Sequence, residues 1–262
     1  MVVFSSLSSY FNQHYFDLLL EMTKREVKIK YKHASLGLMW SILQPILQML
    51  IIGFIFSFFI KMDIKYYFLF LLSGILPWEF FLRSVTKCTT SYVDQRHIIQ
   101  KAKFPLEIIV LSIIFSNLFD LLIALPILFL LGIFLVKIQL VYIFIYLIAL
   151  LFFVIFTIGL SLLTSSLNVQ YRDVKFITEA MLRLWFYVTP VVYSLSLIPD
   201  KFRLFFALNP LTVFFSYFQK LIIEQIALSS TVVFSNVLIL LAIIALGIYQ
   251  FNKRSDYFID WL

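Results

Sequence analysis

Hydrophobic and polar positions follow one another along this chain in long blocks rather than in short periods. Six charge-poor apolar blocks, each long enough for a membrane helix of about 20 residues, are separated by short polar segments. We place them at residues 36–60, 66–85, 107–136, 139–163, 177–197 and 230–250. Barrel strands would alternate over about ten residues, and this pattern is not found. The blocks therefore predict an all-α integral membrane protein with six transmembrane helices.

A basic amphipathic segment precedes the first block, at residues 12–33. At helical spacing, one face is apolar (Phe16, Leu19, Leu20, Val27, Tyr31) and the other is charged (Glu21, Arg25, Lys28, Lys32). The pattern is imperfect, because Lys30 sits near the apolar face. Glu21 with Arg25 and Glu26 with Lys30 have the i,i+4 spacing of favourable ion pairs. We expect an N-terminal helix in the membrane interface; a solvated helix before the first span is the alternative.

A mostly apolar run at residues 204–219 is broken by Asn209–Pro210, and each half is too short to span a membrane. We predict two short re-entrant helices within about residues 200–224, between the fifth and sixth spans. Six spans put both termini on one side. If that side is cytoplasmic, the inner segments carry about twice as many Lys and Arg side chains as the outer ones, as the positive-inside rule requires. A single transmembrane domain over residues 1–262 of the cytoplasmic membrane is therefore expected.

Composition supports the membrane assignment and limits the partners. The chain is 62% hydrophobic and 13% charged, against about 45–50% and about 25% in soluble domains. A net charge of +7 could suggest nucleic acid, but basic residues that flank membrane spans face anionic lipid instead. We expect no nucleic-acid partner. A single cysteine, Cys88, excludes an intrachain disulfide and a cysteine-based metal site, and we expect no metal.

Motifs of catalysis and nucleotide binding are missing from the sequence. The three histidines are far apart and form no HExxH, no GxSxG occurs, and the six glycines form neither GxxxxGK[ST] nor GxGxxG. We therefore expect that this chain binds no cofactor and is not an enzyme. A transferase that acts on a lipid-linked substrate without a known motif is the remaining alternative.

Acidic and basic side chains lie inside several of the predicted spans. Glu79 and Arg83 have i,i+4 spacing, as do Glu179 and Arg183, whereas Asp120 has no partner in its own helix. Charges at membrane depth normally face a partner or a wet cavity. The two pairs either offset the cost of insertion or line a polar path. Asp120 needs a neighbour from another helix, or a proton.

Polar and aromatic side chains mark a possible substrate path. Trp40, Gln44 and Gln48 share one face of the first span. Aromatic clusters occur in the second and fifth spans (Trp78, Phe80, Phe81; Trp185, Phe186, Tyr187, Tyr193). Such rings suit the faces of sugars, and equally the aromatic belt at a membrane surface.

Five stretches of the chain together resemble one family. They are REVKIKYKHASLGLMWSILQP (25–45), LLSGILPWEFF (71–81), LNVQYRDVKFI (167–177), TPVVYSLSLIP (189–199) and LNPL (208–211). In this order they resemble the permease subunit of ABC-2 type polysaccharide exporters, which export O-antigen, teichoic acid or capsule. The stretches do not separate these substrates. An ABC-2 exporter of drugs or lipids is a further alternative, although those proteins usually carry larger external domains.

The resemblance implies a homodimer that binds two copies of a cytoplasmic ATP-binding cassette subunit, which holds the ATP and magnesium. Membrane lipids and a lipid-linked polysaccharide are the other implied partners. Spans 1 and 5 would line the path between subunits, with Trp40, Gln44, Gln48, Glu179, Arg183, Trp185, Tyr187 and Tyr193 as candidates. A coupling helix within about residues 90–103 would contact the ATPase through Arg96, His97, Lys101 and Lys103. The sugar composition, the lipid anchor, the cell-envelope type and any glycan-binding domain of the ATPase stay open.

Overall fold

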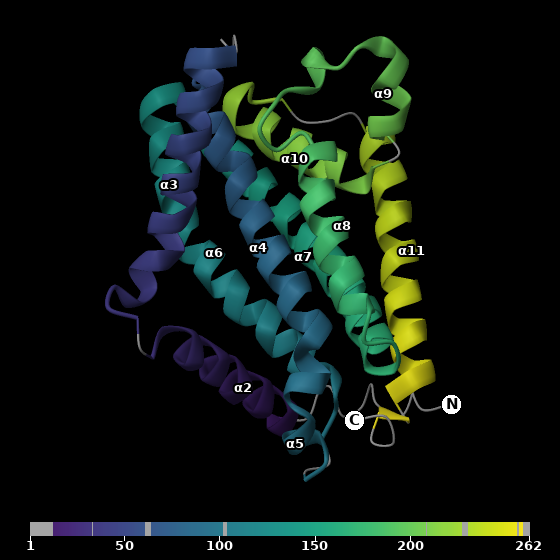
Figure 1. Cartoon of the computed structure of the whole chain (residues 1–262). Coiled ribbons are helices and arrows are strands. Elements are labelled where there is room, and N and C mark those ends of the chain that lie inside the picture. The colour runs from purple at the N-terminus through teal and green to yellow at the C-terminus, as the bar shows by residue number, and fades with distance from the viewer. Residues whose placement is uncertain are drawn as a thin grey trace.

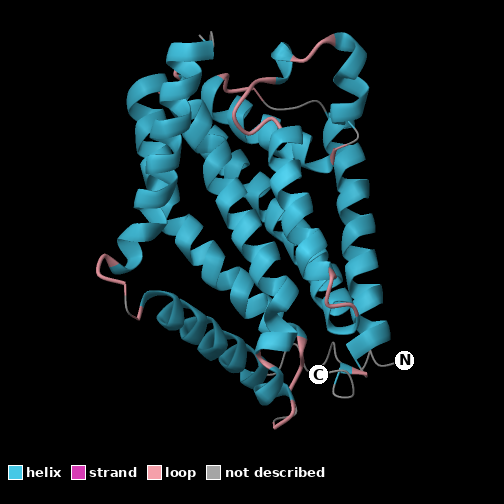
Figure 2. Ribbon diagram, viewed as in Figure 1, coloured by secondary structure: helices cyan, strands magenta, loops and turns pink. Residues whose placement is uncertain are grey.

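The computed structural model describes residues 13–32, 34–60, 64–101, 104–207, 209–226, 230–255 and 257–258. Every regular element in these residues is a helix (Figures 1 and 2). The helices are α2 (Gln13–Tyr31), η1 (Gly37–Met39), α3 (Trp40–Ile55), η2 (Phe56–Ile60), α4 (Tyr67–Asp94), α5 (Arg96–Ile99), α6 (Glu107–Val136), α7 (Leu140–Gln170), α8 (Val174–Val188), η3 (Leu195–Leu197), α9 (Asp200–Ala207), α10 (Pro210–Ile223) and α11 (Ser230–Ser255).

Five of the described helices are long and apolar enough to cross a membrane. These spans are Gly37–Phe59, Tyr67–Asp94, Glu107–Val136, Leu140–Gln170 and Val237–Ser255. Large apolar side chains on the outside of several of them, such as Ile51, Phe134 and Phe144, are more than half exposed, which suits contact with lipid and not with water. The chain is a multi-pass membrane protein.

Helix α4 is the centre of the bundle. In an apolar 18-residue stretch of α4, 83% of the residues are buried, against 17% in the corresponding stretches of the spans at α3 and α11. It packs against α6, α7, α3, α10 and α8. Trp78 of α4 is enclosed by Phe81, Phe186 and Phe215, with ring centroids 5.2–5.8 Å apart. Trp78, Phe80 and Phe81 are therefore core residues, not a wall open to a passing sugar.

A bend between α2 and α3 turns the chain from an inclined helix into a span (Figure 1). Helix α2 ends at Tyr31, near the predicted limit of residue 33, and packs along α6. Gly37 has φ +51, a left-handed conformation that glycine adopts without strain. A short 3-10 turn then leads into α3.

Helix α2 packs on the bundle with a side that the sequence did not single out. Phe16 and Leu20, which we assigned to the apolar face, are more than half exposed, whereas Tyr15 and Glu26 are buried. The predicted pairs within α2 are also not formed, because Glu21 pairs with Lys24 at 2.7 Å and Glu26 turns to another helix. The side of α2 that meets the protein thus carries a charge, and the more apolar side is left for the membrane.

Two spans extend beyond their predicted ends. Helix α4 continues from the predicted residue 85 to Asp94, into the polar segment that separates the second and third apolar blocks. Helix α7 continues from residue 163 to Gln170. In both extensions, serine and threonine hydroxyls donate to carbonyl oxygens three or four residues earlier, as Thr89 does to Val85 at 2.7 Å. Polar residues of this type are satisfied within a helix and need not end it.

The predicted fifth span, residues 177–197, is not one helix. Helix α8 has 15 residues and ends at Val188, which corresponds to about 22 Å at 1.5 Å per residue. Pro190 lacks the N–H that would continue the helix. The irregular backbone beyond it is satisfied from inside the protein: Gln219 Nε2 donates to the carbonyls of Pro190 and Val191 at 2.9 and 3.0 Å, and the Tyr67 hydroxyl donates to that of Val192 at 2.8 Å. Non-helical backbone at membrane depth requires such partners.

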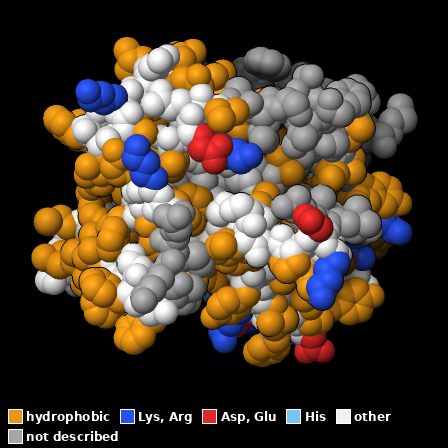
Figure 3. All heavy atoms as spheres, turned by 90° about the horizontal axis from the view of Figure 1, so that it is seen from above, with side chains coloured by type: hydrophobic (Ala, Val, Ile, Leu, Met, Phe, Trp, Pro, Cys, Tyr) orange, Lys and Arg blue, Asp and Glu red, His pale blue; other side chains and the backbone are white. Residues whose placement is uncertain are grey.

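Helices α9 and α10 occupy the segment between α8 and α11, at the end of the bundle opposite α2 (Figure 1). Asn209 caps α10 by accepting from the backbone N–H of Leu211 at 3.1 Å, and Pro210 follows in the first turn, where its missing N–H costs nothing. Figure 3 shows this end of the molecule, where basic and acidic side chains, some of them side by side, lie among apolar ones.

Candidate functional site between α2, α4 and α6

Helix α2 is fastened to the bundle by two polar contacts from one side of the helix. Glu26 and Lys30 are four residues apart, and therefore project from the same face. Glu26 reaches α4 and Lys30 reaches α6. The two contacts therefore tie α2 to two membrane helices.

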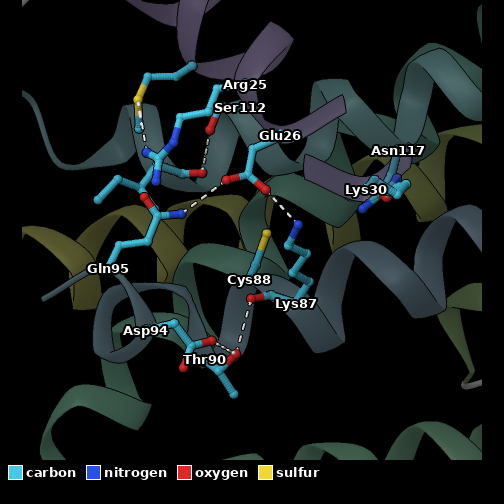
Figure 4. Close-up of polar contacts among 12 residues, drawn as sticks. Arg25, Glu26, Lys30, Lys87, Cys88, Thr90, Asp94, Gln95, Ser112 and Asn117 are labelled. Carbon is cyan, nitrogen blue, oxygen red and sulfur yellow. Dashed lines mark hydrogen bonds and ion pairs between the residues drawn. The ribbon is translucent and has the colours of Figure 1, made fainter. Parts of the chain in front are cut away.

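The first of these, the Glu26 contact, joins three side chains. The Glu26 carboxylate is buried and accepts from Lys87 Nζ at 2.5 Å and from Gln95 Nε2 at 3.3 Å (Figure 4). Lys87 belongs to α4, and Gln95 lies between α4 and α5. The contact therefore links α2 to the point where the long central helix gives way to α5.

The second, the Lys30 contact, reaches an acid inside a membrane span. Lys30 Nζ donates to Asp120 Oδ2 at 2.6 Å and to Asn117 Oδ1 at 2.7 Å. Asn117 Nδ2 in turn donates to Ser84 of α4 at 3.2 Å. Burial lowers the pKa of the Lys30 ammonium, and the Asp120 carboxylate opposes this shift. Asp120 thus has its partner from another element, α2.

A second ion pair lies beside the Lys30 contact. Arg83 Nε is 3.1 Å from Glu79 Oε2 within α4. Glu79, Arg83, Asn117 and Asp120 line one cavity, together with Ser41 and apolar side chains of α3, α4 and α6. Arg83 Nη2 and Asp120 Oδ1 are buried without a hydrogen-bond partner among the described residues. Charges from α2, α4 and α6 are thereby gathered in one polar region next to α3.

The other predicted pair is not formed. Glu179 and Arg183 are both described, yet the structure places no ion pair between them. Arg183 is exposed on α8 and Glu179 is half-buried. The pairing inferred from i,i+4 spacing is therefore right for α4 and wrong for α8.

The predicted path residues form two separate groups. Trp40 and Gln44 are exposed on α3 and Gln48 is half-buried there. Helix α8 and the segment just after it, which holds Tyr193, carry the second group, and α8 lies on the other side of α4 (Figure 1). Within one chain, the structure does not bring the two groups together.

The aromatic residues of the second group differ in exposure. Tyr187 is 72% exposed. Trp185 points inward, and its indole N–H donates to Asn209 Oδ1 at 2.8 Å. The Tyr193 hydroxyl donates to the carbonyl of Tyr187 at 2.8 Å. The hydrogen bonds of Trp185 and Tyr193 thus stabilise the backbone around the end of α8. Tyr187 is the most exposed of the three rings.

The predicted coupling residues lie at the α2 end of the bundle. Arg96 and His97 are exposed on α5, and Lys101 is exposed just after it; Lys103 lies outside the described residues. Helix α5 follows α4 directly and lies near the N-terminal end of α2 in Figure 1. Three cationic or titratable side chains are therefore presented beside the Glu26 contact.

Most of the pairings in the Glu26 and Lys30 contacts were not predicted from the sequence. The sequence marks Lys30 as a fault in the amphipathic pattern and pairs it with Glu26 of the same helix, and Lys87 and Gln95 fall in the polar segment after the second predicted span. A usable signal did exist for Asn117, since it lies three residues before Asp120 and so on the same face of α6. The partner on α2 had no such signal, because it is distant in the sequence.

The region that holds these features matches a known family. Residues 17–223 match the ABC-2 type transporter family, a range that begins in the first turns of α2 and ends with α10. The chain belongs to the ABC-2 type transporter family. Both α2 contacts, α5 and the predicted path residues lie inside the matched range of this ABC-2 protein, whereas α11 lies beyond it.

Similar proteins share a common description. An O-antigen export system permease protein RfbA of Myxococcus xanthus is 30% identical over 213 residues, which cover 80% of this chain and 82% of that protein. A protein of the same description from Klebsiella pneumoniae is 32% identical over 208 residues, covering 79% and 80%. A second Klebsiella pneumoniae protein of that description is 31% identical.

Proposed function

We propose that this ABC-2 protein is the membrane permease of an exporter for a lipid-linked O-antigen-type polysaccharide, driven by ATP hydrolysis in a separate subunit. The observation that carries the proposal is the similarity to O-antigen export permeases along about four fifths of both chains. In this proposal the chain itself binds no cofactor, and ATP with magnesium is held by two copies of an ATP-binding cassette partner.

The geometry suggests how force from such a partner would arrive. The exposed cations Arg96 and Lys101 provide the docking surface, with His97 and Lys103 beside them. A push on α5 is transmitted along α4, because α5 follows it without a flexible linker. The same push moves α2 through Gln95 and Glu26. The Lys30 contact then carries the displacement to α6 and the polar region next to α3.

The path for the glycan is proposed to form between two copies of the chain. Helices α3 and α8 both leave large apolar side chains exposed, and each carries one half of the predicted path. A second copy would place α3 of one subunit near α8 of the other. Gln44, Gln48 and Arg183 would then offer polar groups to the sugar hydroxyls, and Tyr187 a ring to stack on sugar faces.

In the membrane, the end with α2 and α5 would face the cytoplasm, together with both termini. Helix α8 with the backbone after Pro190 would complete a sixth crossing. Helices α9 and α10 would then be the re-entrant pair at the outer surface of the cytoplasmic membrane. The whole chain acts as one transmembrane domain in this arrangement.

The test is reconstitution of the chain with its ATPase partner in liposomes, followed by ATP hydrolysis with and without lipid-linked glycans. We expect O-antigen-type glycans to stimulate hydrolysis and to be translocated, with teichoic-acid and capsule polymers as the comparison. Stimulation only by those polymers, or only by drugs or free lipids, would contradict the substrate. Sugar transfer by the purified chain alone would overturn the permease function in favour of a transferase.

A further inference from the structure

An open groove lies between α2 and α6, on a different side of α2 from the cavity at Asp120. Its volume is about 470 Å³, within the range of sites that hold small molecules. The lining residues are Thr23, Lys24, Val27 and Lys28 of α2 and Phe115, Leu118, Phe119 and Leu122 of α6. Neither the two α2 contacts nor the predicted path residues take part in it.

The two walls of this groove differ in chemistry. The α6 wall is entirely apolar, and Phe115, Phe119 and Leu122 are each more than a third exposed. They belong to a helix apolar enough to cross the membrane. Exposed phenylalanine and leucine at that position are suited to contact with hydrocarbon.

The α2 wall adds positive charge at the rim. Lys28 has no ion pair with any described carboxylate, and Lys24 is paired only with Glu21, where both side chains are about two thirds exposed. An ion pair as exposed as this contributes little and leaves the ammonium available. The Thr23 hydroxyl already donates to the Leu19 carbonyl at 2.7 Å. The long lysine stems can lie along the apolar wall while the ammonium groups stay at the rim.

A ligand for this site needs a hydrocarbon chain and an anionic group at one end. We propose that the groove binds an anionic glycerophospholipid, with one acyl chain against Phe115, Phe119 and Leu122 and its phosphate at Lys24 and Lys28. Charge complementarity favours an anionic lipid, and the apolar wall on a membrane helix favours a lipid rather than a soluble anion. The inference does not depend on the proposed transport function.

Bound lipid would fill the space beneath α2. A neighbouring side of α2 is held by Glu26 and Lys30, so the lipid and the two contacts together would set the position of this helix. The anionic lipid is therefore a structural component of the same region.

The test uses a photoreactive residue inside the groove. Phe119→p-benzoylphenylalanine, in the full chain reconstituted in vesicles with equal amounts of phosphatidylglycerol and phosphatidylcholine, is irradiated and the crosslinked lipids are identified by mass spectrometry. We expect a preference of roughly 25-fold for phosphatidylglycerol, since each of the two lysines near an anionic surface contributes on the order of fivefold in affinity. The preference should shrink in about 1 M salt, because the screening length falls to about 3 Å.

The decisive variant is K24Q/K28Q in the same photoreactive chain. Both lysines are exposed, so this variant keeps the fold, and its crosslinking to lipid should continue without the preference for phosphatidylglycerol. The matched control is K65Q/K201Q, which removes two exposed lysines at the opposite end of the bundle and should keep the preference. Equal crosslinking to both lipids before substitution, an unchanged preference in K24Q/K28Q, or crosslinking to a second polypeptide would each overturn the proposal.

Discussion

Lys30 and Asp120 show why a charge inside a span needs a partner of opposite charge. Their side chains are 20% and 8% exposed, with Nζ and Oδ2 2.6 Å apart. Neither charge would be tolerated alone at this depth, because removing one partner leaves the other desolvated and unpaired. The pair thus keeps α2 against α6 because separation would leave two unpaired charges, and not because the net attraction between them is large.

We expect Lys30→Met and Asp120→Leu each to destabilise the protein by on the order of 3 kcal/mol, the usual cost of a broken buried pair. The double variant should recover most of the loss, since no unpaired charge remains. Unfolding by SDS in mixed micelles, followed by circular dichroism, measures this. A double variant as unstable as the two losses added together would contradict the pairing.

Substitutions at Glu26 and Lys87 should destabilise the protein to different degrees. The Glu26 side chain is 4% exposed and that of Lys87 is 42% exposed. Lys87→Met therefore leaves the buried Glu26 carboxylate with Gln95 as its remaining hydrogen-bond donor. Glu26→Gln instead leaves the Lys87 ammonium, which can turn to water. We expect Lys87→Met to lower the midpoint of thermal unfolding in detergent more than Glu26→Gln does. The reverse order would show that Glu26 is solvated.

At the scale of elements, α7 and α11 approach each other through two glycines. A Cβ at Gly247 would overlap the carbonyl oxygen of Gly159, and a Cβ at Gly159 would lie 2.9 Å from Ile244 Cα. Small residues allow this close backbone approach, which supplies the packing contacts that hold membrane helices together.

Gly247→Ala should therefore separate α7 from α11 and cost about 1–3 kcal/mol, the usual price of overpacking. Gly132→Ala is the matched control, because its Cβ would meet only the Ile138 side chain at 3.3 Å, which can move. Thermal unfolding in detergent compares the two. Equal midpoints would mean that the α7–α11 contact is looser than the structure shows.

Helix α5 is the element through which the proposed ATPase would act. R96A/K101A removes two exposed cations without disturbing a described ion pair, so we expect normal insertion, with loss of most glycan-stimulated ATP hydrolysis in liposomes. K65A/K201A at the other end should leave stimulation intact. Unchanged glycan export by R96A/K101A would exclude this coupling role.

At the scale of the molecule, one chain keeps the predicted path residues in two separate groups. The groups on α3 and α8 lie on opposite sides of α4, and both helices expose apolar side chains. In the proposed dimer, α3 of one copy meets α8 of the other, which both covers these faces and joins the two groups.

Introduced cysteines test this arrangement in membranes. In a Cys88→Ala background, Ile51→Cys with Tyr187→Cys should give a crosslinked dimer with a bifunctional maleimide, because these residues are 61% and 72% exposed on α3 and α8. Leu130→Cys with Ile148→Cys, exposed on α6 and α7, should not. Equal dimer yields from both variants would contradict an interface through α3 and α8.

What the sequence determined by itself was the membrane class, the helical content and the approximate position of most spans. These follow from local composition, since about 20 apolar residues must be helical to satisfy their backbone in lipid. The resemblance that suggested the family also rested on local motifs.

Tertiary structure alone decided how the charges are paired and where α8 ends. Glu26, Lys30, Lys87 and Asp120 find their partners 61 and 90 residues away in the sequence, where helical periodicity carries no information. The early end of α8 similarly depends on Gln219 and Tyr67, which satisfy the carbonyls after Pro190. Helical spacing defines which residues share a face, but only packing defines what that face meets.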